Sequence, residues 1–221
     1  MSDSRITRRG SLVKLGGAGA AAVLGWKAVD ATAGPAAVSQ GLVSCVLAPE
    51  QTEGPYYLEG DKVRRNVTEG RPGAPLTLKL TVIDVSTCKP VKGAAVDIWH
   101  CDAVGAYAAT EGKTFLRGIQ RTDAKGVATF KTIYPGYYEG RTVHIHVKVA
   151  LGGNVVHTGQ LYFSDKVTDT VYTRSPYSAR PARTTRNADD SIYRNGGSRS
   201  TLKLRKVGTA YTGSISMGVQ R

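Results

Sequence analysis

The sequence lacks any long apolar run. No hydrophobic segment reaches the ~18–20 residues that a membrane-spanning helix needs. No stretch longer than about ten residues repeats apolar residues with the 3.6-residue period of an amphipathic helix. These absences argue against a helical bundle and against an integral membrane segment in the mature protein.

Cysteine is also scarce, with three residues in 221, which excludes a zinc site made of four thiolates. In an oxidising compartment three cysteines give one disulfide and one free thiol. Cys88 lies in a predicted turn between two strands, and Cys101 follows well along the second strand, so the two are not opposite each other. We therefore predict a Cys45–Cys88 disulfide.

Acidic residues are few: 17 Asp and Glu stand against 30 Lys and Arg, and the formal net charge is +13. Such a charge can attract nucleic acid or other anionic polymers. The basic residues are scattered, however, with no run longer than two and no helical stripe. We interpret them as a solvated surface and expect no nucleic-acid partner.

The N-terminus is typical of an export signal. Arg8 and Arg9 form a twin-arginine pair, a mildly apolar stretch follows over 15–26, and Ala31-Thr32-Ala33 offers a cleavage site. We predict a twin-arginine signal peptide over 1–33, a linker over 34–44 and one folded domain over 45–221. The protein is then expected in the periplasm or outside the cell.

Within that domain, short apolar–polar alternations are separated by glycine- and proline-rich turns. Strands are predicted over 76–85, 94–100, 127–133, 155–163, 202–204 and 211–217, and around a histidine pair at 144–146. Gly152-Gly153-Asn154 predicts a hairpin turn. Residues 114–121 show little periodicity, and 164–200 are polar and irregular. The pattern predicts an all-β fold, a β-sandwich core of antiparallel strands with long irregular loops.

The histidine pair, His144-Ile145-His146, is the main chemical signal. Side chains alternate along a strand, so both imidazoles project from one face and can hold a single metal ion. Tyr138 and Arg141 lie just upstream.

The residue types near the pair bear on which metal it would bind. His157, across the predicted hairpin, makes a three-histidine zinc hydrolase site conceivable. Against zinc, Glu139 is the one carboxylate near the pair, and it stands at a turn tip. Tyr107, Tyr137 and Tyr138 are available instead, and phenolate oxygens with imidazole nitrogens suit a hard trivalent ion such as iron(III).

Five segments carry a resemblance to a known family: TEGPYY at 52–57, GAAVDIWHCDAVGAY at 93–107, FKTIYPGYY at 130–138, RTVHIHV at 141–147 and HTGQLYF at 157–163. In this order they resemble the intradiol ring-cleaving dioxygenases, and the chain looks most similar to the small, exported branch. The resemblance implies a β-sandwich that holds iron(III) and cleaves catechol-type diols between the hydroxyls with O2, giving cis,cis-muconates.

The resemblance also implies roles for particular residues. The metal ligands would be two tyrosines and two histidines: Tyr107, Tyr138, His144 and His146. Tyr138 would leave the metal when substrate arrives and act as a base, although the adjacent Tyr137 is a competitor. Arg141 would stabilise anionic intermediates, and Gln160 would lie near substrate and O2.

Other residues have plainer interpretations, and other functions remain open. Trp99 is expected in the core, His100 as a structural histidine, and Tyr56 and Tyr57 either in the core or lining a pocket. Alternatives to the dioxygenase are a non-catalytic β-sandwich binding module and the zinc hydrolase. Because no extra cation stands near the pair, catechols without a carboxylate are the expected substrates.

Overall fold

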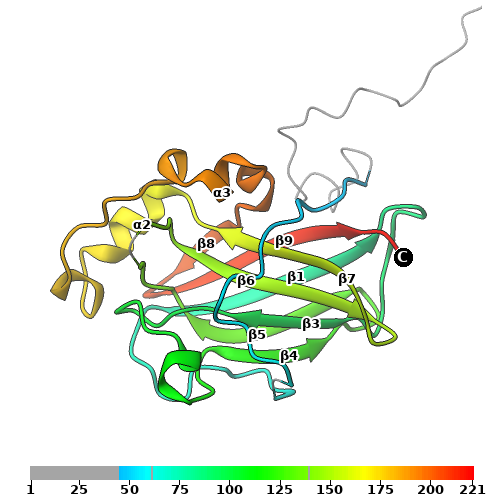
Figure 1. The fold of residues 1–221 in the computed structure, drawn as a ribbon, viewed down its shortest axis with the longest axis horizontal. Helices are drawn as coiled ribbons and strands as arrows, with labels where there is room; N and C mark the ends of the chain where they lie inside the picture. Colours follow the sequence, from blue (N-terminus) through cyan, green and yellow to red (C-terminus); the bar gives the residue numbers. More distant parts are fainter. Residues whose placement is uncertain (1–44, 61, 139) are drawn as a thin grey trace, which may run out of the picture.

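The computed structural model describes residues 45–60, 62–138 and 140–221, which form two layers of strands (Figure 1). The predicted signal peptide, 1–33, and linker, 34–44, lie outside the described residues. Among those that are described, no helix is long and apolar enough to cross a membrane. The prediction of an all-β sandwich with irregular loops is confirmed.

The first layer is a five-stranded sheet. Its members are β1 (Pro75–Asp84), β2 (Lys89–Pro90), β5 (Val127–Ile133), β8 (Lys203–Val207) and β9 (Ala210–Val219). The alternation in β1 decides which face is buried: Leu76, Leu78 and Leu80 are at most 1% exposed, whereas Lys79 faces solvent. The buried leucines pack in the core between the sheets.

The second layer is a four-stranded antiparallel sheet in the order β4-β3-β6-β7. Its members are β3 (Ala95–Trp99), β4 (Arg117–Arg121), β6 (His144–Leu151) and β7 (Asn154–Tyr162). Gly152 and Gly153 form the turn between β6 and β7 with positive φ at both positions, so the predicted hairpin is confirmed. The strand β4 was not expected from its weak periodicity, and it forms by pairing with β3.

One strand pair departs from the antiparallel prediction. β9 runs parallel to β1, with Leu76 opposite Tyr211 and Asp84 opposite Val219. A parallel pair needs a long connection, and here the whole chain between residues 84 and 210 supplies it. The remaining named strand pairs are antiparallel.

The segment 164–200, expected to be irregular, contains short helices outside the two layers (Figure 1). They are η2 (Tyr177–Ala179), η3 (Asn187–Asp189), α3 (Ser191–Arg194), η4 (Gly197–Ser200) and the eight-residue α2 (Asp165–Tyr172). A further 3-10 turn, η1 (Ala108–Glu111), follows Tyr107. Asp190 directly follows η3 and is the N-cap residue of α3.

The first described residues, 45–58, form an extended arm across the second sheet (Figure 1). Its Gln51 N–H donates to Thr158 O of β7 at 2.9 Å. The buried Arg117 of β4 donates to the carbonyls of Tyr56 at 2.9 Å and Leu58 at 2.8 Å. These bonds tie the arm to both edge strands of the sheet.

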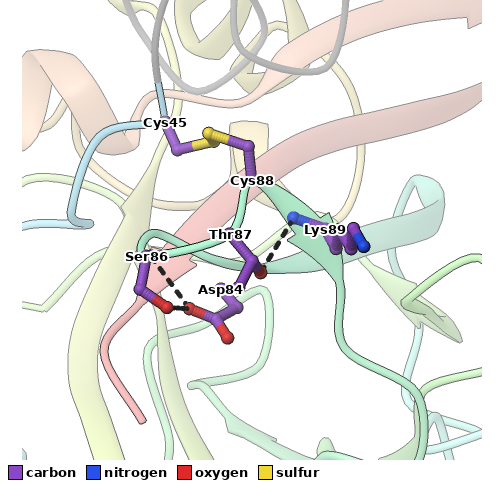
Figure 2. Close-up of a disulfide and its surroundings, with 6 residues drawn as sticks. All are labelled: Cys45, Asp84, Ser86, Thr87, Cys88 and Lys89. Carbon is purple, nitrogen blue, oxygen red and sulfur yellow. Dashed lines mark hydrogen bonds between the residues drawn. A yellow bond between two sulfur atoms is a disulfide. The ribbon is translucent and has the colours of Figure 1, made fainter.

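The arm is also tied covalently at its start. Figure 2 shows the Cys45–Cys88 disulfide, which joins the arm to the turn after β1, with the Cα atoms 5.5 Å apart. Asp84 orders that turn by accepting bonds from the Ser86 N–H and hydroxyl, at 2.9 and 2.6 Å. The predicted disulfide is confirmed, and Cys101 is the buried free thiol.

Candidate functional site

The strand β6 places the two imidazoles together. His144 and His146 project from one face, and their Nε2 atoms lie 3.1 Å apart. The pairing register adds Gln160 beside His146 and Tyr162 beside His144, because partners in antiparallel strands share a face. This face points away from the sandwich core and is covered by the arm.

Neighbouring groups fix the orientation of both rings. His144 Nδ1 lies 2.7 Å from the Thr142 carbonyl, to which it donates, so the Nε2 lone pair remains available. The indole of Trp99 stacks on His146, with ring centroids 5.0 Å apart and planes at 6°. Trp99 was expected in the core; it is fully buried, but on the site's side of the sheet.

Burial keeps both histidines neutral. It lowers the pKa of His144 from 6.5 to about 3, and Arg141 contributes further to that shift. It also lowers the pKa of His146 well below its usual value, helped by the neighbouring His144. A neutral imidazole is the form that binds a metal ion.

Two tyrosines from separate loops converge on the histidines. The Tyr138 hydroxyl lies 3.4 Å from His144 Nε2. The Tyr107 ring lies 5.6 Å from the Tyr138 ring and 6.2 Å from the His146 ring, centroid to centroid. Within the described part of the chain, the buried Tyr107 hydroxyl has no partner with ordinary hydrogen-bond geometry. Burial raises the pKa of both phenols.

The neighbouring Tyr137 points elsewhere. Its hydroxyl donates to the Pro181 carbonyl at 2.7 Å, and its ring packs against Tyr172 and under the guanidinium of Arg180. Tyr138 is therefore the member of the pair that lies at the histidines.

Arg141 and Gln160 complete the polar side of the site. The Arg141 guanidinium donates to the Tyr138 hydroxyl at 3.2 Å and to Gln160 Oε1 at 2.5 Å. Gln160 is fully buried and is held by its own bond to the Thr52 carbonyl, at 3.0 Å. The structure thus brings together the six residues to which the resemblance assigned a role: Tyr107, Tyr138, Arg141, His144, His146 and Gln160.

The other two histidines do not join the site. His157 is paired with Val149, so it lies on the opposite face of the sheet, and its Nδ1 is 2.7 Å from Glu50 Oε1. His100 is fully buried and spans the two sheets through a 2.7 Å bond between its Nε2 and Thr132 of β5, as its structural interpretation predicted. The three-histidine arrangement is therefore not formed.

Three further residues lie beside the site. Tyr56 of the arm, for which the sequence left a core or a pocket position open, stacks on Tyr107 with the ring centroids 4.2 Å apart. Gly54 approaches His146 so closely that a Cβ would lie 3.0 Å from the imidazole, and its φ of +75° also favours glycine. Asp190, from the irregular segment, bonds to Arg141. The TEGPYY segment contains Tyr56 and Gly54, but the sequence analysis did not predict that Gly54 would lie against His146, and no local signal marked Asp190 as a partner of Arg141.

The donor set is suited to a metal ion only if phenols take part. In the described residues no group of three or more His, Cys, Asp or Glu side chains could hold a metal. Two imidazole nitrogens and two phenol oxygens are, by contrast, gathered here; His144, His146 and Tyr107 are buried and Tyr138 is half-buried. The buried Tyr107 hydroxyl and the available Nε2 lone pair of His144 fit such a role.

Comparison with known proteins agrees with these motifs. A family model described as Dioxygenase matches residues 52–182. The solved intradiol ring-cleavage dioxygenase of Tetranychus urticae is 34% identical, with a TM-score of 0.75, over 80% of this chain and 95% of that one. The dioxygenase domain of a carbohydrate-binding fusion protein from Streptomyces sp. SirexAA-E is also 34% identical, with a TM-score of 0.63, over 79% and 99% of the two chains.

Among curated proteins, catechol 1,2-dioxygenase 1 of Acinetobacter lwoffii is 32% identical over 100 residues. That match covers 41% of this chain and only 32% of the relative. The chain therefore spans about a third of the length of this curated relative.

Proposed function

The chain belongs to the intradiol ring-cleavage dioxygenases, and from that premise we propose that it is an exported iron(III) enzyme. It cleaves catechol-type diols between the two hydroxyls with O2 and yields cis,cis-muconates. The observation that carries the proposal is the convergence of two neutral imidazoles and two phenols, from three segments, at one buried position.

Tyr107, Tyr138, His144 and His146 would hold the ion. Two neutral nitrogens and two anionic oxygens favour iron(III) over zinc, which prefers thiolate, imidazole or carboxylate ligands. Bound iron(III) would withdraw electron density from a catecholate and so let its ring react with O2. Among the described residues, which leave out Glu139, no carboxylate is hydrogen-bonded to the histidine pair, and this makes the zinc hydrolase the weaker alternative.

Tyr138 is suited to move the substrate's proton. Its phenol has a pKa raised by burial, so its anion is a strong base that can take a proton from an incoming catechol at the Tyr138 oxygen. Arg141, 3.2 Å from that oxygen, offers fixed positive charge where negative charge develops. Gln160 holds the second terminal nitrogen of the guanidinium and lies beside His146.

The charge balance of the site supports a substrate without a carboxylate. Arg141 is already paired with Asp190 at 2.8 Å, and Lys148, two residues after His146, is paired with Glu53. An additional anionic group on the substrate would have to compete for one of these cations. Catechol and its alkyl or hydroxy derivatives are therefore the proposed substrates.

The location of the reaction is proposed from the sequence. The twin-arginine pair at Arg8 and Arg9 supports export of the folded protein to the periplasm or medium. The Cys45–Cys88 disulfide agrees with an oxidising compartment.

The test is oxygen uptake by the iron-reconstituted protein with a panel of catechols, with the muconate product followed in the ultraviolet. We expect a coloured protein, because phenolate-to-iron(III) charge transfer absorbs visible light, and uptake of one O2 per diol. A colourless protein that binds no iron(III) and consumes no O2 would instead favour the non-catalytic binding module.

A further inference from the structure

Asp190 is a buried carboxylate at the edge of the site, in a segment that shows no catalytic motif. Its side chain is 1% exposed, and that of Arg141 is 16% exposed. The Asp190 Oδ2 accepts from Arg141 Nε at 2.8 Å and from the Thr142 N–H at 2.9 Å. The Asp190 Oδ1 accepts from the first turn of α3, at Ile192 N (2.8 Å) and Tyr193 N (3.2 Å).

The bond to Nε determines where the rest of the guanidinium points. A guanidinium is planar, with its donors in a fixed fork, so holding Nε directs both terminal nitrogens. Here Nη1 is directed to the Tyr138 hydroxyl and Nη2 to Gln160 Oε1. The Thr142 bond to the same oxygen fixes the backbone next to Arg141.

The short helix α3 is itself anchored at its other end. Gln51 of the arm donates to the carbonyls of Ile192 at 2.8 Å and Asn195 at 3.2 Å. The Tyr162 hydroxyl lies 3.1 Å from both Gln51 Oε1 and Gln160 Oε1, and its single proton is shared between these two acceptors. A closed network thus links the arm, α3, Arg141 and Gln160.

We propose that Asp190 is the positioning residue for Arg141, fixing the guanidinium against Tyr138 and Gln160 through a carboxylate supplied by the C-terminal segment. The inference rests on the proposed function, because it assigns Asp190 a part in that reaction. Asp190 does not itself reach Tyr138, so its effect on the reaction passes through Arg141.

Both carboxylate oxygens are needed for this arrangement. Four N–H donors face Asp190, two at each oxygen. An asparagine has one acceptor oxygen, so in either orientation its NH2 group would face two donors. A serine, by contrast, can still cap α3 but is too short to reach Arg141.

Asp190→Ser therefore separates the two tasks of the residue. We expect it to keep the fold, measured by thermal melting, and to lower kcat about 10- to 100-fold, because a displaced catalytic group typically costs that much. The KM should change less than about threefold. Asp189→Ser is the matched control: the exposed Asp189 carboxylate accepts from Arg186 N within its own turn and makes no bond to Arg141 in the described structure, so kcat should be unchanged.

A double-mutant cycle distinguishes positioning from general destabilisation. In an Arg141→Ala background, Asp190→Ser should lower kcat by less than about twofold further, because the group it positions is gone. An equal further loss in that background, or an unchanged kcat in the single variant, would overturn the proposal. If Asp190→Ser does not fold, Asp190→Thr keeps the capping hydroxyl and replaces it in the cycle.

A crystal structure of Asp190→Ser gives a readout that does not depend on turnover. We expect the Arg141 guanidinium to have left hydrogen-bonding distance of Tyr138 or Gln160; an unmoved guanidinium contradicts the proposal. If the wild-type protein cleaves none of the catechols, the proposed function fails, while this structure still decides whether Asp190 positions Arg141.

Discussion

Two adjacent tyrosines have opposite surroundings in this protein. The Tyr138 hydroxyl is 3.4 Å from His144 Nε2, whereas the Tyr137 hydroxyl donates to Pro181 in the C-terminal segment. Because neighbouring side chains in an extended segment point in opposite directions, one residue of shift would exchange their roles.

Because only Tyr138 of this pair lies at the histidines, replacing Tyr138 should change the visible spectrum of the iron-loaded protein and replacing Tyr137 should not. In the iron(III)-loaded protein, Tyr138→Phe should remove one phenolate donor and so weaken or shift the visible charge-transfer band. Tyr137→Phe should leave the band unchanged, since its hydroxyl only bonds to a surface carbonyl. Visible absorption spectra of both variants at matched iron content check this. The reverse pattern would assign the ligand role to Tyr137.

The buried His100 should make the free energy of unfolding depend on pH in the acid range. Burial lowers the pKa of His100 from 6.5 to about 4, so the unfolded chain binds a proton in this range while the folded protein does not. Stability should therefore fall as the pH drops from about 6.5 to about 4, by up to about 3 kcal/mol from this residue.

Urea unfolding of the metal-free protein at pH 7 and pH 4.5 measures this effect. His100→Gln will be less stable at pH 7, because it loses buried contacts, but its further loss in acid should be smaller than that of the wild type. The pKa values of His144 and His146 are lowered chiefly by their burial, with only a smaller contribution from His100, so most of the difference between the two proteins comes from His100 itself. If the wild type and His100→Gln lost the same unfolding free energy between pH 7 and pH 4.5, His100 would not be a source of the acid sensitivity.

At the scale of elements, the arm over 45–58 covers the site without belonging to either sheet. Two residues of the arm contact the site directly: Tyr56 stacks on Tyr107, and Gly54 lies against His146. Lys148 of β6 holds the arm from below. Its ammonium pairs with Glu53 and lies 3.4 Å from the centre of the Tyr57 ring. The Cys45–Cys88 disulfide fixes the point at which this arm begins.

The disulfide should therefore stabilise the fold as a whole and also hold the arm over 45–58 in place above the site. The two cysteines are 43 residues apart, and closing a loop of that size contributes about 4 kcal/mol in the chain-entropy description. Cys45→Ser/Cys88→Ser should lower the free energy of unfolding by about 2–4 kcal/mol and speed hydrogen exchange in the arm. Denaturant unfolding and hydrogen-exchange mass spectrometry measure the two effects.

Reduction of the wild-type protein serves as the control for that experiment, because it opens the same bond without changing a side chain. Reduced wild-type protein and the double variant should unfold at the same denaturant concentration. If the arm exchanges no faster in either sample, its other contacts hold it without the disulfide.

At the scale of the whole molecule, stability comes from the layer of apolar side chains between the two sheets. β1 lies in the middle of its sheet, paired with both β5 and β9, and its inward leucines are completely enclosed. Removing a large part of one such side chain leaves a cavity that the surrounding strands cannot fill.

Leu78→Ala should consequently lower the free energy of unfolding by about 2–5 kcal/mol. Its neighbour Lys79 faces solvent, so Lys79→Ala should change the stability by less than about 0.5 kcal/mol. Denaturant unfolding of both variants checks the prediction. If both variants lost a similar amount of unfolding free energy, Leu78 would not be on the buried face of β1 and Lys79 on its exposed face.

Local patterns in the sequence predict the elements that depend only on neighbouring residues. The alternation along β1 decides its buried face, and the glycines at 152–153 predict the hairpin between β6 and β7. Strand β4 has little periodicity of its own and could not be predicted in this way, because it forms by pairing with β3. Helix α2 was not predicted either, because its eight residues are too few to show a clear helical period.

The sequence by itself determined that His144 and His146 share one strand face and that phenols and imidazoles are the available donors, and it predicted the Cys45–Cys88 disulfide that the structure contains. Only the tertiary structure decided that Tyr138 rather than Tyr137 meets the histidines, that β9 runs parallel to β1, and that Asp190 reaches Arg141. The reason is physical: side-chain alternation depends on adjacent residues, whereas contacts between distant segments depend on how whole strands and loops pack together.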